Sequence, residues 1–575
     1  MTETTSPKTS SLFDNEERFK QIAGILIALV TILTAIVGYL QNDAGSLDDR
    51  ANRQAQEYAF QAMGQRISGA AQAGYARGDA YRTWSELNTL ALAAENGGDP
   101  MAAERYRAVA ERMTQLSPLL SDKAYFDPAS GEPNVAKYEA DTYLIEVTAL
   151  AERSAAWFAV KQAWDEKANT YVVHLTILAV ALFLLGLATT ISGRARWIFM
   201  VAGVVIALIA MVWTVNVYLT PVERISDPAI DAYAQGVGLA YQGEAEQAIK
   251  AFDEALAKEP GYANALFGRG GTHYDLGNYK AALADFEAAQ KAGRDDASVG
   301  WNLAWLYYLQ GDFARSIQAN RRTLDQNPDL LEARFDLALA LLVSGQIDQA
   351  KESYEQALSL AAAQVAKAEA ADPPQEPPAS LWWSFDEAVA SLDGLLDRID
   401  GFDDSWWSET PPLDKINQPD QVYTAAQEIL AQIKGNSVAL EYTGRPLTGA
   451  LTAQVDPFTF AEAQYDEDGE FVSYIPAGSF PAGTDEVLIV FDYKGMQDGQ
   501  DVVWKVYYNG EEDVAWRTVE DWSLGVDGTA EFPLSYAYSN VYTLASGEYL
   551  VEMYVDSHLA QRGYFVIEEE SEVSE

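Results

Sequence analysis

The chain has 575 residues, enough for several domains, and its 85 acidic side chains outnumber 39 basic ones, giving a formal net charge of −46. This balance argues against nucleic acid as a direct partner, because binding to phosphate requires clustered Lys and Arg. Cysteine is absent, which excludes thiolate zinc sites, thiol catalysis and disulfides, and with only three histidines a multi-His metal centre is not expected.

Three apolar runs interrupt the acidic background, at residues 22–40, 171–191 and 197–219. Each has about the length, roughly 20 residues, that crosses a bilayer as a helix. Aromatic residues stand near the ends of the second and third runs, where they suit a membrane interface. A signal peptide is the alternative for the first run, but the run is longer than a usual signal core and has no small-x-small cleavage site. The sequence therefore predicts three transmembrane helices in a lipid bilayer.

The short loops predict how these helices are oriented. Both the N-terminal tail (1–21) and the hairpin 192–196 carry basic residues, which tend to stay in the cytoplasm. Residues 41–170 and everything after residue 219 are then outside the cytoplasm, on a multi-pass protein of the plasma membrane. Basic residues also flank the spans on the opposite side, so the orientation stays a prediction.

Between the first two spans, residues 41–170 contain many good helix formers and few breakers. This segment loosely resembles, in architecture only, the extracytoplasmic four-helix sensor bundles of bacterial receptors. The alternative is a stalk or a bundle for self-association. His174 lies inside the second apolar run, where an ionisable group can mark an ion path, but it stands alone and near the interface.

A repeat of 34 residues follows, most visible in its glycines Gly243, Gly277, Gly311 and Gly345. The four units, 229–262, 263–296, 297–330 and 331–364, resemble the tetratricopeptide repeat (TPR) family. Small residues at the positions where two helices cross, a glycine in the turn and an aromatic ring between helices form its packing pattern. In this sequence the packing positions are Gly236, Gly243, Ala248, Phe252, Gly270, Gly277, Ala282, Phe286, Gly311, Gly345, Ala350 and Tyr354.

The resemblance implies an all-α solenoid whose concave groove, lined by the first helix of each unit, binds a peptide or protein. This groove is aromatic and lacks the Lys and Arg that clamp a terminal carboxylate in some family members. Aromatic rings suit proline-rich or apolar peptides and helices. Alternatively, several of these rings pack between units. The groove positions carried over from the family are Tyr233, Tyr241, Phe267, Tyr274, Asp275, Trp301, Trp305, Tyr308 and Phe335.

Residues 365–437 read as a proline-rich linker followed by two capping helices near 383–400 and 418–434. The four prolines between residues 373 and 378 favour a stiff, extended spacer. The same segment could fold back and fill the aromatic groove, as an internal mimic of the ligand.

From residue 438 to 568 the helical pattern stops, and short β-rich runs predict an antiparallel β-sandwich. Asn509-Gly510 is a hairpin signal. The segment resembles immunoglobulin-like modules of bacterial surface proteins, without their cysteine pair. Trp504 is a predicted core residue, whereas Trp516 and Trp522 are either core or an aromatic platform for carbohydrate. Residues 569–575 form an acidic, solvated tail.

The fold class is thus a multi-domain membrane protein with a helical bundle and three transmembrane helices, an all-α TPR solenoid and an all-β antiparallel sandwich. No phosphate-loop, HExxH, GxSxG or kinase motif is present, so no enzyme activity, catalytic residue, cofactor or metal is expected. We predict a membrane-anchored scaffold or assembly factor for envelope or secreted proteins. An envelope sensor using residues 41–170, or a carbohydrate-binding surface protein using the sandwich, are the alternatives.

Overall fold

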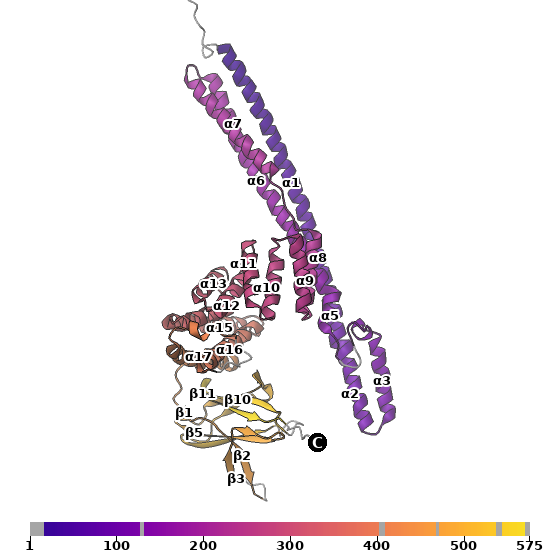
Figure 1. Ribbon diagram of the computed structural model, residues 1–575, viewed down its shortest axis with the longest axis vertical. Coiled ribbons are helices and arrows are strands. Elements are labelled where there is room, and N and C mark those ends of the chain that lie inside the picture. The colour runs from indigo at the N-terminus through magenta and orange to yellow at the C-terminus, as the bar shows by residue number, and fades with distance from the viewer. Residues whose placement is uncertain (1–15, 127–131, 402–408, 467–470, 536–542, 570–575) are drawn as a thin grey trace, which may run out of the picture. The chain divides into compact units, whose positions relative to one another are not determined.

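A computed structural model describes residues 16–126, 132–401, 409–466, 471–535 and 543–569 (Figure 1). The predicted tails before residue 16 and after residue 569 lie outside this range. The chain divides into two compact units, residues 1–294 and 295–575, and each is described by itself. The boundary falls between the second and third repeats, so each unit contains two of them.

Three apolar helices begin the first unit: α1 (Glu16–Gly74), α6 (Ile145–Thr190) and α7 (Ala195–Leu219). By length and composition all three are able to cross a membrane. Because α1 has 59 residues, it is about 90 Å long at 1.5 Å per residue, three times the apolar thickness of a bilayer. Since neither helix contains a proline, α1 continues as a single helix after its apolar run, and α6 begins well before its own run, which forms the last part of the helix.

The core of these three helices contains many alanines and valines together with a few large side chains, such as Leu178 and Leu185. On α1 the buried residues Ala23, Val30, Val37 and Ala44 recur every seven positions, the spacing of a coiled-coil seam. They share a core with α6 and α7. Large side chains such as Ile25, at 61 % exposure, point outward from the bundle. This arrangement suits helices surrounded by lipid, where small residues let backbones approach closely.

The remaining helices between α1 and α6 are α2 (Arg82–Asn96), α3 (Pro100–Thr114) and the short α4 (Pro118–Ser121) and α5 (Val135–Glu139). The π-helical turns η1 (Tyr75–Tyr81) and η2 (Ala140–Leu144) join them to the long helices. α2 pairs with α3 and α1 pairs with α6. In the described residues, segment 41–170 is therefore two helical pairs in series, without a core shared by four helices.

The repeats are four helix pairs. The first unit contains α8 (Asp227–Tyr241) with α9 (Ala245–Lys258), and α10 (Ala263–Asp275) with α11 (Tyr279–Lys291). The second contains α12 (Ala297–Leu309) with α13 (Phe313–Gln326), and α14 (Leu331–Val343) with α15 (Ile347–Glu369). The turn glycines Gly243, Gly277, Gly311 and Gly345 have φ values of 77°, 71°, 73° and 81°, a region that a side chain disfavours.

Two further helices follow the repeats, α16 (Ala379–Asp400) and α17 (Pro419–Thr443), with the 3₁₀ turn η3 (Leu413–Lys415) between them. They pack against α14 and α15. The proline-rich residues 371–378 contain neither helix nor strand. α17 continues past the predicted start of the sandwich at residue 438, because residues 438–443 extend its buried apolar face through Val438, Ala439 and Leu440.

The C-terminal part consists of two packed sheets, as the β-rich pattern predicts. One sheet has the order β1-β5-β2-β3, with β9 also paired to β5, and the other has the order β4-β11-β10-β6-β7, with β8 also paired to β6. All pairings are antiparallel except β4 with β11. The first sheet contains β1 (Gln454–Val455), β2 (Thr459–Tyr465), β3 (Phe471–Pro476), β5 (Glu486–Lys494) and β9 (Gly528–Ser535); the second contains β4 (Ser479–Phe480), β6 (Asp501–Tyr508), β7 (Glu511–Glu512), β8 (Thr518–Asp521), β10 (Gly547–Val555) and β11 (His558–Ile567).

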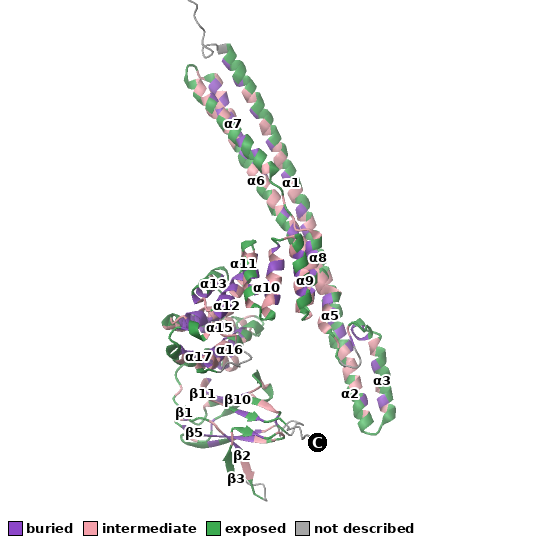
Figure 2. Ribbon diagram, in the orientation of Figure 1, coloured by how far each residue is buried: buried purple, intermediate pink, exposed green. Residues whose placement is uncertain are grey.

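The core of the sandwich lies between the two sheets and is rich in aromatic rings. Trp504 and Trp522 are 6 % and 3 % exposed within it, and Trp516 packs against it. Trp504 is thus in the core, as the sequence predicts, and burial leaves Trp522 unavailable as a carbohydrate platform. The predicted hairpin at Asn509-Gly510 joins β6 to β7, with positive φ at both residues. Figure 2 shows buried residues along β5 and β10, whereas α1 to α3 are mostly exposed or half-buried.

Candidate functional site

The first repeat is packed against α6, the helix that continues from the second apolar run. The Glu152 carboxylate of α6 accepts a hydrogen bond from the Tyr262 hydroxyl at 2.7 Å and, at the start of the second repeat, one from the Asn264 amide of α10 at 2.9 Å. Arg153 of α6 pairs with Asp231 at 2.5 Å and lies 3.6 Å from Asp227, both on α8. Behind these charges, alanines of α6 and α8 share a buried cluster. Helix α6 therefore covers α8, the first helix of this repeat.

Two predicted groove residues lie in this covered repeat. Tyr233 packs between Phe252 and Tyr262, and burial together with the nearby Glu152 raises its pKa to about 12. Tyr241 is 50 % exposed, and its hydroxyl donates a hydrogen bond to the carboxylate of Glu139, the last residue of α5. That hydrogen bond, more than burial, raises the pKa of Tyr241 to about 12. Both side chains thus contact the chain itself.

The second repeat carries a stripe on α10 made of Phe267, Gly271 and Tyr274, with two half-buried rings on either side of the glycine. The three positions are four and three residues apart, so they lie on one helix face. A Cβ placed on Gly271 would have no atom within 4 Å, so the middle of the stripe is free space. Phe267 stacks beneath the Arg294 guanidinium at 3.7 Å, and the Tyr274 ring is 5.5 Å from Tyr279.

Next to this stripe, the predicted residue Asp275 is exposed, and partial burial of its carboxyl raises its pKa. Arg269, also on α10, links this helix to α9 and α11. Its guanidinium binds Asp285 of α11 at 2.6 Å and Asp253 of α9 at 2.5 Å. This cross-link, which is buried only on the side of Asp285, joins the two repeats of the first unit.

In the second unit, α16 covers the inner face of the third and fourth repeats. The Trp383 ring is 6.3 Å from Trp301 and crosses it edge-on, and Phe385 is 5.8 Å from Phe335. Phe335 itself is 3 % exposed. Aromatic residues of the helix that follows the proline-rich segment contact this face. Two predicted groove residues of these repeats, Trp301 and Phe335, therefore contact the chain's own helix.

The indole N–H groups of two predicted groove residues donate hydrogen bonds to carboxylates of the chain. Trp301 donates to Asp336 at 2.6 Å, and Trp305 donates to Glu409 at 2.7 Å. Tyr308 stacks on Trp305 and is 2 % exposed. Burial raises the pKa of Asp336 to about 7, even though the hydrogen bond from Trp301 opposes this rise.

The predicted packing positions of the repeats fall into two groups that differ in burial. The turn glycines are exposed or half-buried, and the helix-crossing residues are buried. The glycines at two crossings have little room: a Cβ on Gly236 would lie 2.6 Å from the Phe252 ring, and one on Gly270 would lie 3.1 Å from Phe286. The other buried members are Ala248, Ala282, Ala350 and Tyr354.

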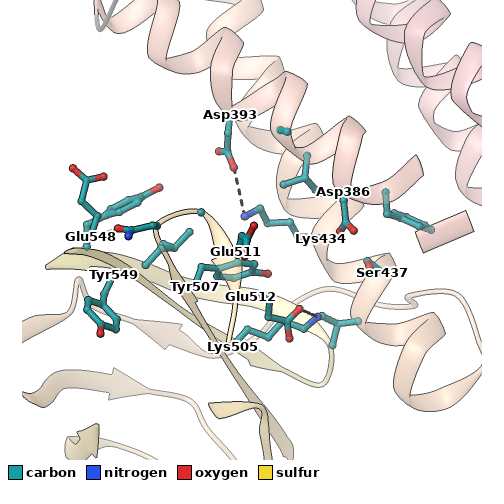
Figure 3. Close-up of a pocket in the computed structure, with 18 of the residues that line it drawn as sticks. Asp386, Asp393, Lys434, Ser437, Lys505, Tyr507, Glu511, Glu512, Glu548 and Tyr549 are labelled. Carbon is teal, nitrogen blue, oxygen red and sulfur yellow. Dashed lines mark hydrogen bonds and ion pairs between the residues drawn. The ribbon is translucent and has the colours of Figure 1, made fainter. Parts of the chain in front are cut away.

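A cavity of about 520 Å³ lies between α16, α17 and the second sheet (Figure 3). Its helical wall includes Asp386, Asp393, Asp397 and Lys434, and its strand wall includes Tyr507. In Figure 3 the Lys434 ammonium reaches from α17 toward Asp393 of α16, 3.6 Å away. The same ammonium binds the fully buried Glu552 of β10. This ion cluster ties the sheet to the two helices.

Sequence reasoning did not find the residues that cover the repeats or line this cavity. Glu152 and Arg153 are far from the repeats in sequence, and their pattern is that of any helical surface. Asp393, Lys434 and Glu552 lie in three different elements, so no local spacing reveals them. Trp382 and Trp383 did give a signal, as paired aromatic rings directly after the proline-rich segment.

The tetratricopeptide repeat family matches this chain at residues 233–297, 272–330 and 331–364. Among solved structures, YrrB, a TPR protein with an unusual peptide-binding site, is 17 % identical, with 35 % of this chain and 86 % of that one covered and a TM-score of 0.24. MamA from Desulfovibrio magneticus RS-1 is 22 % identical over 28 % of this chain and 85 % of that one, with a TM-score of 0.23. No curated protein matches the chain.

Proposed function

Because residues 233–364 are tetratricopeptide repeats, which support protein–protein interaction, we propose that this chain is a membrane-anchored scaffold that holds a protein partner against α10. The observation that carries the proposal is the free space over Gly271, between the rings of Phe267 and Tyr274. The partner is an envelope or secreted protein that the scaffold helps to assemble. The role is one of binding and not of catalysis.

The stripe suits an apolar or proline-rich segment of the partner. Two aromatic rings flank the free space over Gly271, where a partner side chain could approach the helix backbone closely. The corresponding faces of the other repeats are in contact with the chain's own helices, α6 in the first unit and α16 in the second. In the second unit the occupant is itself a helix bearing aromatic side chains, which supports a similar ligand for α10.

Anchoring in the plasma membrane is proposed from α1, α6 and α7. Many of their large apolar side chains point outward, while alanines and valines occupy much of the seam. In this proposal residues 1–21 and 192–196 lie in the cytoplasm, and the repeats and the sandwich lie outside it.

Site-specific photo-crosslinking in intact cells tests the binding proposal. A photoreactive phenylalanine analogue at Gly271 is expected to give discrete protein adducts, which Tyr274→Ala weakens. The matched control is the same analogue at Ala284, on the exposed face of α11. Equal adducts from both positions, or none from Gly271, would contradict a partner on α10.

Labelling of single cysteines tests the orientation, because the chain has no cysteine of its own. A membrane-impermeant maleimide is expected to label Ala284→Cys in intact cells and Ser192→Cys only after the cells are opened. The reverse result would place the repeats in the cytoplasm and change the partners that they can reach.

An envelope sensor is a second candidate, favoured by the continuity of α6. This single helix runs from the second apolar run to Glu152 and Arg153, which bind the first repeat. A displacement of the helix would therefore reach the repeats directly. If Arg153→Ala leaves the response to an envelope stimulus unchanged, the sensor role is excluded for this contact.

A further inference from the structure

Helix α1 carries exposed apolar side chains far beyond its apolar run. Phe60, Met63 and Ile67 are 74 %, 62 % and 62 % exposed. The apolar run ends at residue 40, and α1 continues without a break to Gly74. Phe60 therefore lies about 20 residues, or about 30 Å, past the end of the run. Lipid around the run does not reach these side chains, so a protein surface is the cover that removes them from water.

These side chains belong to a regular row on one side of the helix. Phe60, Met63, Ile67, Ala70 and Gly74 follow one another at alternating steps of three and four residues, the spacing of a two-helix coiled coil. All five residues are exposed and uncharged. We call this row the distal α1 face.

The distal α1 face points away from α6, the helix with which α1 is already paired. On the α6 side, the Ala55 carbonyl accepts a hydrogen bond from the Ser154 hydroxyl at 2.8 Å. The buried Gly69 is also on that side, since a Cβ placed on it would overlap the Tyr143 side chain of η2. Gly69 is two positions from Ile67, which is about 200° around the helix. Pairing with α6 therefore leaves the distal α1 face exposed.

The size of this face limits what can cover it. A stable complex of two freely diffusing proteins buries at least about 1,200 Å² in total, more than three large side chains on a single helix provide. A second copy of the chain needs less contact area. Anchors in the same membrane hold both α1 helices side by side and raise their effective concentration.

The anchor also sets the geometry of such a pair. Two anchored copies have their α1 helices in the same direction, so a two-fold axis along the helices places each residue of the face opposite its own counterpart. Ala70 and Gly74 then let the two backbones approach closely. The contact avoids the repulsion that a net charge of −46 produces between copies, because the face is uncharged. It begins after Arg53, seven positions before Phe60 on the same side of the helix, where like charges would meet.

We propose that two copies of this chain associate in parallel through the distal α1 face. The inference rests on the membrane anchoring of α1 proposed above, and it is independent of the α10 stripe.

Disulfide crosslinking in isolated membranes tests the dimer, because the full-length chain has no cysteine of its own. A single cysteine, Met63→Cys or Ala70→Cys, is expected to link two copies under mild oxidation, since counterparts then lie within the distance that a disulfide spans. The matched controls Gln61→Cys and Arg66→Cys are exposed on other sides of α1 and are expected to give at least about fivefold less dimer. Equal yields at all four positions would indicate random collisions and overturn the contact.

A second pair of variants alters the face and keeps the crosslinking position. In the Ala70→Cys protein, Met63→Glu with Ile67→Glu places like charges opposite each other and is expected to lower the dimer yield at least about fivefold. Both side chains are exposed, so the pairing of α1 with α6 is left intact. The control, Ala59→Glu with Gln61→Glu, adds the same charge beside the face and is expected to keep the yield. An undiminished yield in the first variant would overturn the proposal.

Two further measurements separate the occupant from the anchor. When two differently tagged copies are expressed together, the crosslinked species is expected to contain both tags, and an adduct with another protein in its place would overturn the second copy as occupant. Alkaline extraction of the membranes tests the anchor. A chain that is released contradicts the anchor and removes the basis of the dimer, whereas a retained chain without crosslinks specific to the face contradicts the dimer alone.

Discussion

The repeats of the two units are covered by their own chain in different ways. In the first unit, α6 meets the first repeat through a small buried cluster of alanines bordered by charged and polar contacts, such as Arg153 with Asp231 and Glu152 with Tyr262. In the second unit, α16 meets the third and fourth repeats through aromatic rings, such as Phe385 on Phe335. The repeat pattern specifies the residues that pack between helices and leaves the inner positions of each repeat free to vary. One pattern can therefore build a docking face bordered by charged residues or one made of aromatic residues.

This contrast implies contacts of unequal strength. Partly exposed ion pairs contribute at most about 1 kcal/mol each, whereas a buried aromatic side chain contributes several. We therefore expect the cover in the second unit to be permanent and that in the first unit to be the more easily released. Four predictions test this view, beginning with the largest effect.

Phe385→Ala tests the aromatic cover. Phe385 is 1 % exposed, and its loss is expected to lower the free energy of unfolding of the second unit by about 3–5 kcal/mol. Trp383, at 46 % exposure, gives the matched control, and Trp383→Ala should cost much less. Thermal unfolding and limited proteolysis of residues 371–400 measure both. Equal effects of the two variants would show that α16 is held elsewhere.

Asp336→Asn tests the buried carboxyl beneath the aromatic cover. With a pKa of about 7 in the folded state and about 3.9 in the unfolded state, Asp336 binds a proton more tightly when folded, so stability falls as pH rises from about 4 to about 7. The asparagine variant keeps an acceptor for the Trp301 indole and should reduce this slope by up to about 1.4 kcal/mol per pH unit. Urea unfolding at several pH values checks it, with Asp325→Asn as control. An unchanged slope would show that Asp336 is not protonated in this range.

Much of this architecture could be predicted from local patterns. The apolar runs, the 34-residue repeat and the Asn509-Gly510 hairpin are all encoded within a few tens of residues, and they appear as expected helices, helix pairs and a turn. The covering contacts could not be predicted, because they join residues far apart in sequence. Arg153 meets Asp231 only after α6 has folded back along α1, and Lys434 meets Glu552 only after the sandwich has packed on α17.

The groove residues illustrate this limit. The family pattern identifies the helix face on which Trp301 and Phe335 lie, but it does not tell whether that face is open. Trp383 and Phe385 decide that question for the second unit. On α10 the informative residue is Gly271, whose missing side chain leaves space between two rings. From the sequence alone, a glycine inside a helix indicates only a lower helix propensity. The space that Gly271 leaves beside the helix is recognised only when the neighbouring residues are known.

Gly271→Ala tests whether α10 is open. An alanine there meets no other atom and gains helix propensity, so the free energy of unfolding should rise by about 0.5–1 kcal/mol. The adjacent Gly270→Ala is the control, because its Cβ would lie 3.1 Å from Phe286 and 3.3 Å from Asp285. Chemical denaturation distinguishes them. A loss of stability in Gly271→Ala would mean that the stripe is already covered and would remove the basis for a partner on α10.

Arg153→Ala tests the polar cover and should have the smallest effect on stability. Asp231 is mostly exposed and Asp227 also pairs with Arg224 at 3.0 Å, so the loss should be at most about 1 kcal/mol and should shrink as salt is added. Hydrogen exchange of α8 is the sharper measurement, because release from α6 would speed exchange there. Arg82→Ala, which removes an exposed pair within α2, is the control. If salt and Arg153→Ala both leave α8 fully protected, its alanine contacts with α6 hold it in place, and the first repeat is as permanently covered as the third and fourth.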